Sequence, residues 1–326
     1  MSRTSTTSGA SAAIATTLSP VVRRGATADG PFSLVITPES AGWGYCSLRI
    51  LELPAGGSAT FDTGEDETCV LPLSGGCTVT CVDGDGVESE FEITGRASVF
   101  SRVTDFAYVP RDARVTVSSA GGGRFALPAA RATRRLPARY GPAEGVPVEL
   151  RGAGQASRQV NNFCRPDSFD ADKMIAVEVL TPAANWSSFP PHKHDEDRPG
   201  ESRLEEIYSF EVDHDGPGYQ RVYSSGPDRQ IDVCAEVSTG DTVLVPHGWH
   251  GPSMAAPGYH LYYLNVMAGP SPDREWLICD DPAHGWIRDT WADQEMDPRL
   301  PLTSTAEKTA TSEKTATTEL SRKDAR

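Results

Sequence analysis

The sequence predicts an all-β protein, either a β-sandwich or a β-barrel. Short runs in which apolar and polar residues alternate recur along the chain, as in residues 47–53. Turns rich in Gly interrupt these runs, for example at residues 54–57 and 83–86. Alternation with a period of two is typical of strands with one buried face, whereas apolar residues at helical spacing are scarce. Short, evenly spaced strands between turns favour a sandwich or barrel.

The expected strands fall into two groups along the chain. In the first half we expect strands at residues 32–37, 47–53, 67–73, 77–82, 106–110 and 114–118. In the second half we expect strands at residues 174–180, 206–210, 219–224, 231–237, 242–245 and 260–267. Residues 276–291 follow the last strand, and we expect them to pack as a short cap.

Changes in composition divide the chain into five parts. Residues 1–27 are rich in Ser, Thr and Ala, and residues 301–326 are rich in Thr, Ala, Ser, Glu and Lys. We expect both ends to be disordered, with a marginal helix as the alternative for the tail. Two domains are expected between them, at residues 28–135 and 161–300. Residues 136–160 are expected to be a connector; a phosphate-binding patch is the alternative, but no Gly-rich loop there leads into a helix.

Composition excludes several classes of function. The net charge of −15 over 326 residues argues against a nucleic-acid partner, whose backbone needs Lys and Arg, but it allows a small anionic substrate bound by a local Arg. The seven Cys are scattered without Cys-x-x-Cys spacing, which favours reduced thiols in a cytoplasmic protein. We find no apolar run long enough to span a membrane and no signal peptide. A homo-oligomer is allowed by these observations.

Two short stretches concentrate the residue types that bind metals. His192 and His194 are two positions apart, so on a strand their side chains share one face. Glu206 opens the next expected strand, and a hairpin would return it toward the two His. His250 follows a short apolar strand and a turn. Imidazoles and a carboxylate are good ligands for a divalent first-row metal, and four such ligands leave coordination positions open for chemistry.

Each assignment has an alternative among neighbouring residues. A single His is more often a surface or hydrogen-bonding residue, but the combined pattern favours a metal site. Glu205 competes with Glu206, because adjacent residues on a strand face opposite ways. His247 competes with His250 in the second stretch. Lys193 lies between two candidate ligands, so alternation turns it away from the metal, and Asp195 could accept a His N–H.

The two stretches resemble the two sequence motifs of the cupin superfamily. The first is residues 190–208, which begin Pro-Pro-His-Lys-His, and the second is residues 240–250. The insert after His194 is longer than in most cupins, and the second motif has one residue fewer before its last His. These departures, together with the amino-acid sequences of residues 185–195 and 257–269, make the chain resemble the 5-deoxy-glucuronate isomerases of inositol catabolism, which are relatives of the keturonate isomerases. The resemblance covers about residues 33–291.

The resemblance implies a bicupin, with two cupin-type β-barrels. All seven His lie in the second half: His192, His194, His214, His247, His250, His260 and His284. The N-terminal barrel therefore lacks metal ligands and is a degenerate copy. In the second barrel the resemblance selects His192, His194, Glu206 and His250 as ligands of one divalent metal ion, Zn, Mn or Fe, with Zn favoured.

The resemblance also implies a reaction. An aldose–ketose isomerase would convert 5-deoxy-D-glucuronate to 5-dehydro-2-deoxy-D-gluconate by moving one proton from C2 to C1. A metal touching the carbonyl oxygen would stabilise the enediolate that forms. Two other functions fit the same site: a cupin dioxygenase that uses Fe(II), and a non-catalytic sugar-binding cupin.

The remaining site residues are candidates by position alone. Tyr208, Tyr262 and His260 lie on neighbouring expected strands and are candidates for the proton carrier. The plain alternative for each Tyr is a barrel-filling ring with a satisfied hydroxyl. Candidates for the substrate carboxylate are Arg165, Arg203 and Arg221. For each Arg the plain alternative is a solvated surface charge.

Overall fold

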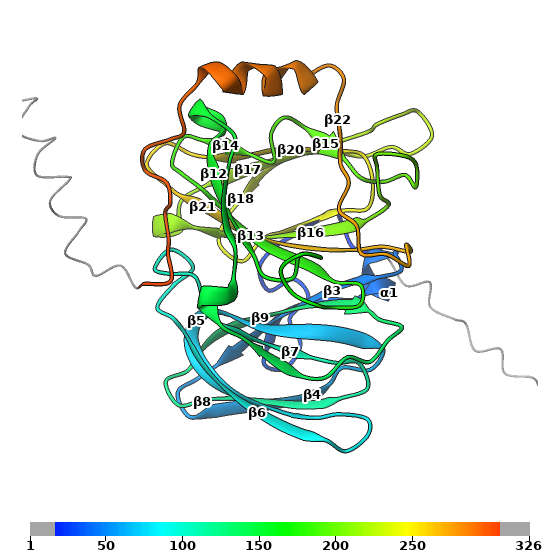
Figure 1. The fold of residues 1–326 in the computed structure, drawn as a ribbon, viewed down its shortest axis with the longest axis vertical. Helices are drawn as coiled ribbons and strands as arrows, with labels where there is room; N and C mark the ends of the chain where they lie inside the picture. Colours follow the sequence, from blue (N-terminus) through cyan, green and yellow to red (C-terminus); the bar gives the residue numbers. More distant parts are fainter. Residues whose placement is uncertain (1–16, 307–326) are drawn as a thin grey trace, which may run out of the picture.

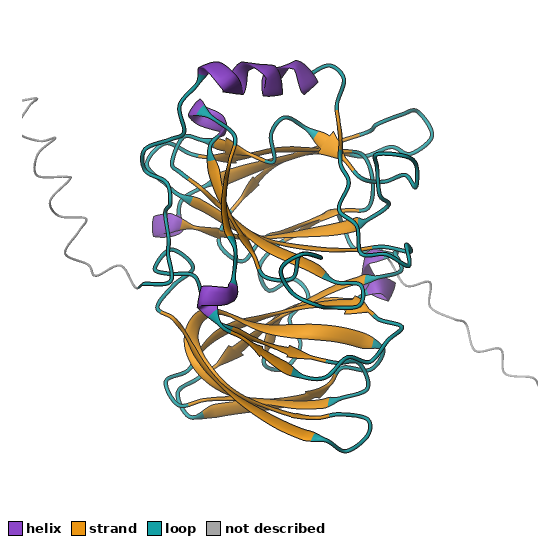
Figure 2. Cartoon of the chain, viewed as in Figure 1, coloured by secondary structure: helices purple, strands orange, loops and turns teal. Residues whose placement is uncertain are grey.

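The protein is built of two stacked units of β-strands, as Figures 1 and 2 show. The computed structural model describes residues 17–306. Its only α-helix in this range is a single turn, α1 (Pro38–Ala41), and its other helical segments are 3₁₀. None of the helices in the described range is long and apolar enough to cross a membrane. The prediction of an all-β protein is confirmed.

The first unit comes from the N-terminal half of the chain and forms one nine-stranded system. Its strands are β2 (Phe32–Ile36), β3 (Cys46–Leu53), β4 (Gly57–Asp62), β5 (Asp66–Val82), β6 (Glu88–Arg96), β7 (Phe106–Val109), β8 (Arg114–Ser119), β9 (Gly123–Arg131) and β10 (Arg139–Gly141). The main path runs β10-β7-β5-β9-β3-β2. The 17-residue β5 continues beyond this path to pair with β6 and β8. This long strand therefore joins the two layers that enclose the unit's own core, which includes Phe61, Val79 and Phe125.

The second unit consists of two facing sheets. The seven-stranded sheet contains, in spatial order, β1 (Val21–Val22), β19 (Thr242–Val245), β16 (Glu205–Val212), β21 (Leu261–Ala268), β13 (Ile175–Thr181), β12 (Arg158–Asn162) and β11 (Val148–Arg151). The six-stranded sheet contains β18 (Asp232–Val237), β17 (Gly218–Tyr223), β20 (Trp249–Ala255), β15 (His192–Lys193) and β22 (Cys279–Asp280), with β14 (Trp186–Ser187) beside β20. Short 3₁₀ segments are η1 (Ala143–Gly145), η2 (Gly154–Ala156), η3 (Asp213–Asp215) and η4 (Gly285–Asp293). In Figure 1, η4 lies across the end of this unit, where a cap was expected.

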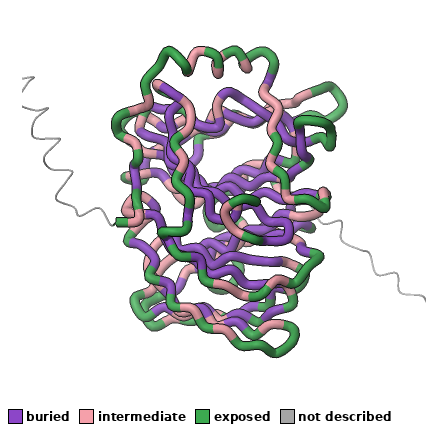
Figure 3. The backbone as a smooth tube through the Cα atoms, in the orientation of Figure 1, coloured by how far each residue is buried: buried purple, intermediate pink, exposed green. Residues whose placement is uncertain are grey.

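The central strands of the seven-stranded sheet are buried on both faces, because one face packs on the first unit and the other faces the second sheet (Figure 3). All eight residues of β21 are buried. Its side chains alternate: Leu264 and Val266 join a core shared with Leu48 and Ile50 of the first unit. Tyr263 and Met267 belong instead to the core between the two sheets of the second unit. Alternation along β21 therefore decides which side chains can reach a site inside the second unit.

The structure corrects the expected boundaries of the disordered ends. Val21 and Val22 form β1 and pair with β19, so residues 17–27 are ordered because their backbone completes the edge of a sheet. Residues 301–306 are also part of the fold: the buried Thr303 exchanges hydrogen bonds of 2.9 to 3.0 Å with Gln159. Residues 1–16 and 307–326, the rest of both segments, lie outside the described residues.

The expected connector also contains regular structure. β11 and the first residues of β12 lie within residues 136–160, and they pair with each other at the edge of the seven-stranded sheet. This stretch was predicted as a linker because of its Arg, Pro and Gly content. Its last part instead supplies one wall of the second unit.

Candidate metal centre and cavity

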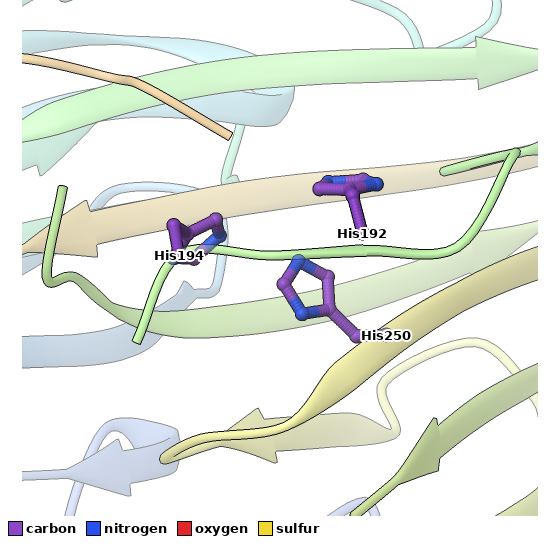
Figure 4. Close-up of side chains that lie close together, drawn as sticks. All are labelled: His192, His194 and His250. Carbon is purple, nitrogen blue, oxygen red and sulfur yellow. The ribbon is translucent and has the colours of Figure 1, made fainter. Parts of the chain in front are cut away.

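Three imidazoles, those of His192, His194 and His250, converge inside the second unit (Figure 4), and His250, expected in a turn, lies on a strand. His192 on β15 lies directly opposite His250 on β20 in an antiparallel pair. His194 follows β15 on the same face. The ring of His250 has its centre 4.5 Å from that of His192 and 4.7 Å from that of His194. All three side chains are buried, and one nitrogen of each lies within 4.8 Å of the others.

The backbone around the three rings fixes which nitrogen of each is available. The Nδ1 atoms of His192, His194 and His250 each lie 3.2 Å from a backbone carbonyl oxygen, those of Pro190, Leu204 and Gly248 respectively. A carbonyl can only accept, so each Nδ1 carries a proton, and in the neutral form of each ring Nε2 presents a lone pair. Burial and the two neighbouring imidazoles also lower the pKa of His192 well below its usual value, which favours the neutral, metal-binding form.

Glu206 completes the cluster from the opposite sheet. Its Oε2 lies 3.1 Å from Nε2 of His194 and 3.1 Å from Nε2 of His250. The buried Nε2 of His250 has no hydrogen-bond partner within residues 17–306. Lone pairs of nitrogen and oxygen that face one another in a buried site repel unless a cation lies between them. The donor set therefore fits a divalent metal, and these four residues would hold it.

Glu205 and His247, the alternatives to Glu206 and His250 as ligands, lie outside the cluster. Glu205, next to Glu206 on β16, accepts backbone N–H groups of Gly44, Tyr45 and Cys46 in the first unit at 2.7 to 3.0 Å. It therefore ties the two units together, as the alternation of β16 requires. His247 is half-buried in the turn before β20 and does not belong to the cluster of three His.

A buried ion network supports the two ligand-bearing stretches. Lys193 turns away from the cluster, as predicted, and its Nζ lies 2.7 Å from both Asp195 and Glu201. Asp195 also accepts the N–H of Gly248 at 2.9 Å and a guanidinium N–H of Arg229 at 2.9 Å. The expectation that Asp195 accepts a His N–H is wrong, because the nearer backbone carbonyls take those protons. Asp195 instead joins the stretch of His194 to the stretch of His250.

Close backbone packing holds β20 against the loop before β15. Gly251, directly after His250, has φ +102°, a conformation that side chains rarely adopt. A Cβ atom added there would lie 1.8 Å from the carbonyl oxygen of Ser188. Only Gly allows β20 to approach this loop, so Gly251 helps to set the distance between the two ligand-bearing stretches.

A cavity of about 590 Å³ adjoins the cluster. His192 and Glu206 line it, as do the predicted site residues Tyr208 and Arg165. The Tyr208 hydroxyl lies 2.9 Å from Ser188 Oγ, and its ring centre is 6.1 Å from that of His250. Burial and the Glu206 carboxylate raise the pKa of Tyr208 well above its usual value, so its hydroxyl is protonated at neutral pH.

Two of the proposed proton carriers do not line the cavity. Tyr262 is buried on the opposite face of β21 and donates a hydrogen bond of 2.8 Å to Glu178. The next residue, Tyr263, faces the cavity in its place. His260 precedes β21, and its Nδ1 accepts the backbone N–H of Ala183 at 3.0 Å. The sequence indicated an aromatic strand at these residues. It did not indicate the register of that strand, which determines whether Tyr262 or Tyr263 faces the cavity.

Two of the three arginines predicted to bind the substrate carboxylate also lie outside the cavity. Arg203 is exposed in the loop before β16, and Arg221 on β17 pairs with Asp232 of the neighbouring strand. Neither lines the cavity. Cavity residues that the sequence reasoning missed come from the expected connector and from the cap: Arg151, Arg158, Trp276, Asp280, Arg288 and Trp291. The alternation of Val148 and Leu150 with charged residues could have indicated the strand that carries Arg151.

Comparison with solved structures places this fold in a known class. An IolB-like protein from Salmonella typhimurium superimposes with a TM-score of 0.75 and 35% identity, over 82% of this chain and 98% of that protein. Oxalate decarboxylase from Lactobacillus farciminis superimposes with a TM-score of 0.54 at 12% identity, over 76% of this chain and 82% of its own, which shows the fold alone. The protein therefore has a cupin-type fold, as the sequence motifs predict.

Sequence comparison then narrows the class to one family. The model of the KduI/IolB family matches residues 21–287. The chain is 41% identical over 259 residues to the 5-deoxy-glucuronate isomerase of Geobacillus kaustophilus, covering 78% of this chain and 90% of that enzyme. It is 39% identical over 257 residues to the 5-deoxy-glucuronate isomerase of Bacillus subtilis strain 168, covering 77% and 91%. The chain belongs to the KduI/IolB family, and the prediction that it is an isomerase is confirmed.

Proposed function

We propose that the protein is a metal-dependent isomerase that converts 5-deoxy-D-glucuronate to 5-dehydro-2-deoxy-D-gluconate. The observation that carries the proposal is the convergence of three Nε2 lone pairs and one carboxylate beside a cavity large enough for a sugar acid. Support for the substrate comes from relatives that carry this activity in their names and that the chain matches over about nine-tenths of their length.

The proposed cofactor is one divalent metal ion held by His192, His194, Glu206 and His250. Three imidazoles and one carboxylate suit Zn, Mn or Fe, and we favour Zn because its sites commonly combine these ligand types. When bound, such an ion supplies a Lewis acid that stabilises negative charge on a carbonyl oxygen. The protein's part is to orient the three imidazoles, which the carbonyls at their Nδ1 atoms do.

We assign Tyr208 as the residue that donates a proton or hydrogen bond to the reacting oxygen. The reaction removes a proton from C2, so negative charge develops on the carbonyl oxygen in the transition state. Tyr208 is buried, lines the cavity beside the His cluster and keeps its proton because of its raised pKa. Ser188 orients the phenol through a bond of 2.9 Å between the two hydroxyl oxygens. A protonated, oriented donor of this kind typically contributes 10² to 10⁴-fold, as general acids do.

Proton NMR of the metal-loaded protein with 5-deoxy-D-glucuronate in heavy water tests the proposal. We expect the ketone product to appear with deuterium at the carbon that was the aldehyde, because the transferred proton exchanges with solvent at the enediol stage. Conversion without deuterium would support a hydride shift or a shielded proton instead. Absence of conversion in a metal-loaded sample would refute the assigned substrate, and oxygen uptake in the same sample would favour a dioxygenase.

A further inference from the structure

Four arginines line the cavity, and their partners differ. Three have a carboxylate within hydrogen-bond distance: Arg151 with Glu149 at 2.7 Å, Arg165 with Asp167 at 2.8 Å, and Arg288 with Asp280 at 2.7 Å. The fourth, Arg158, has no carboxylate within 4.0 Å among residues 17–306. A cavity whose other guanidinium groups are already neutralised therefore keeps one uncompensated positive charge.

The surroundings of Arg158 hold its guanidinium in place without neutralising it. The residue is only 7% exposed. Its Nη1 donates to the backbone oxygens of Ala156 at 3.1 Å and Phe189 at 3.3 Å. The guanidinium carbon lies 5.7 Å from the centre of the Trp291 ring, which comes from the cap. No acceptor within the described part of the chain takes the hydrogens of its Nε or Nη2, so that edge of the guanidinium is available to a ligand.

A buried charge without a counter-charge is unfavourable by several kcal/mol, so its retention needs a reason. Burial, together with the nearby guanidinium groups of Arg151 and Arg288, lowers the pKa of Arg158 to about 10, although Tyr263 and Glu149 act in the opposite sense. The group is still charged at neutral pH. An anion that entered the cavity would gain from a fixed, desolvated fork of N–H donors.

Arg158 and the His cluster are held by consecutive residues of one loop. The carbonyl of Phe189 accepts from Arg158, and the next carbonyl, that of Pro190, faces Nδ1 of His192. The side chains of Arg158 and His192 line the same cavity. A ligand in this cavity can therefore place an anionic group on Arg158 while another part of it reaches the His cluster.

We propose that Arg158 binds the carboxylate of a sugar-acid substrate and thereby directs its carbonyl end toward the His cluster. The identity of the acid rests on the proposed function, whereas the carboxylate subsite does not. Trp291 covers the guanidinium from the cap, so η4 contributes to the subsite by keeping water from the ion pair. Arg165, the cavity arginine that the sequence indicated, is already paired with Asp167.

Calorimetric titration of the metal-loaded protein with D-gluconate and with D-sorbitol tests the subsite. The two molecules have the same carbon chain and differ in a carboxylate that one has and the other lacks. We expect the wild type to bind gluconate at least about tenfold more tightly than sorbitol, and up to about 150-fold, as for hydrogen bonds to a charged group. Equal binding of the two would overturn the proposal.

Variants separate Arg158 from the other charges of the cavity and from the metal. Arg158→Met should remove the preference for gluconate with metal content unchanged, and Arg158→Lys, which keeps the charge but not the fork, should retain part of it. Arg151→Met removes a cavity arginine that has a carboxylate partner, and it should keep the preference. An Arg158→Met protein that still prefers gluconate, or an equal loss in Arg151→Met, would contradict the assignment.

The same proteins distinguish failure of the subsite from failure of the proposed function. If the wild type isomerises 5-deoxy-D-glucuronate and Arg158→Met has an unchanged kcat/KM, the function stands and the subsite is wrong. If gluconate binding depends on Arg158 but 5-deoxy-D-glucuronate is not converted, the subsite stands and the substrate is wrong.

Discussion

Replacing Glu178 with Gln should destabilise the protein strongly while leaving the cavity intact. The Glu178 carboxylate on β13 faces the first unit and forms a bidentate pair with Arg96 of β6, and both side chains are fully buried. It also accepts from Tyr262 at 2.8 Å and from Asn161 at 3.2 Å. Gln keeps the shape but removes the negative charge, so the guanidinium of Arg96 would stay buried without compensation.

Breaking a buried ion pair from one side costs about 3 to 5 kcal/mol. We therefore expect Glu178→Gln to lower the free energy of unfolding by about this amount in urea titrations followed by tryptophan fluorescence. The double variant Arg96→Met with Glu178→Met removes both charges and should lose less than the single variant. If Glu178→Gln lowers the free energy of unfolding by less than about 1 kcal/mol, the pair does not stabilise the interface between the units to the extent expected. A fall in kcat of the folded fraction would contradict the placement of this cluster outside the site.

Three further predictions follow from the site and its supports. Tyr208→Phe should lower kcat by about 10² or more in the isomerase assay, whereas Tyr262→Phe should change kcat little; the reverse order would exchange their roles. Asp195→Asn should weaken metal binding about 10 to 100-fold in competition with a chelator, because it loosens the link between the two ligand stretches, and unchanged affinity would contradict this. Burial would raise the pKa of Asp172, but hydrogen bonds from Arg134 and Thr133 outweigh it and lower the pKa to about 2. The ionised carboxylate therefore contributes about 2 kcal/mol to the free energy of unfolding above pH 4, and this contribution is lost as the pH falls toward 2. Asp172→Asn should flatten the acid side of a profile of stability against pH. An unchanged acid side would contradict this prediction.

The parts of the site that depend on local spacing could be predicted from the sequence. The interval of two between His192 and His194 places them on one face of an extended segment whatever the rest of the fold is. The opposite orientations of Glu205 and Glu206 follow from the same alternation. Both outcomes are visible in the structure, where Glu206 faces the His cluster and Glu205 the first unit.

The parts that depend on register and on long-range packing could not be predicted. Alternation shows that Tyr262 and Tyr263 face opposite ways, but only the pairing of β21 with β13 and β16 decides which of them faces the cavity. Arg158 was missed for a different reason. Its stretch has the composition of a linker, and it forms a strand because β13 offers an edge with which it can pair.

The most direct test of the central claim is to measure metal content and isomerase rate together. We would determine metals by mass spectrometry in the wild type, Glu206→Gln and His250→Ala, and measure conversion of 5-deoxy-D-glucuronate by each. We expect one divalent metal per wild-type chain, joint loss of metal and rate in both variants, and return of the rate when metal is added to chelator-treated wild type. Full conversion by metal-free wild type, or by a variant that holds no metal, would contradict it.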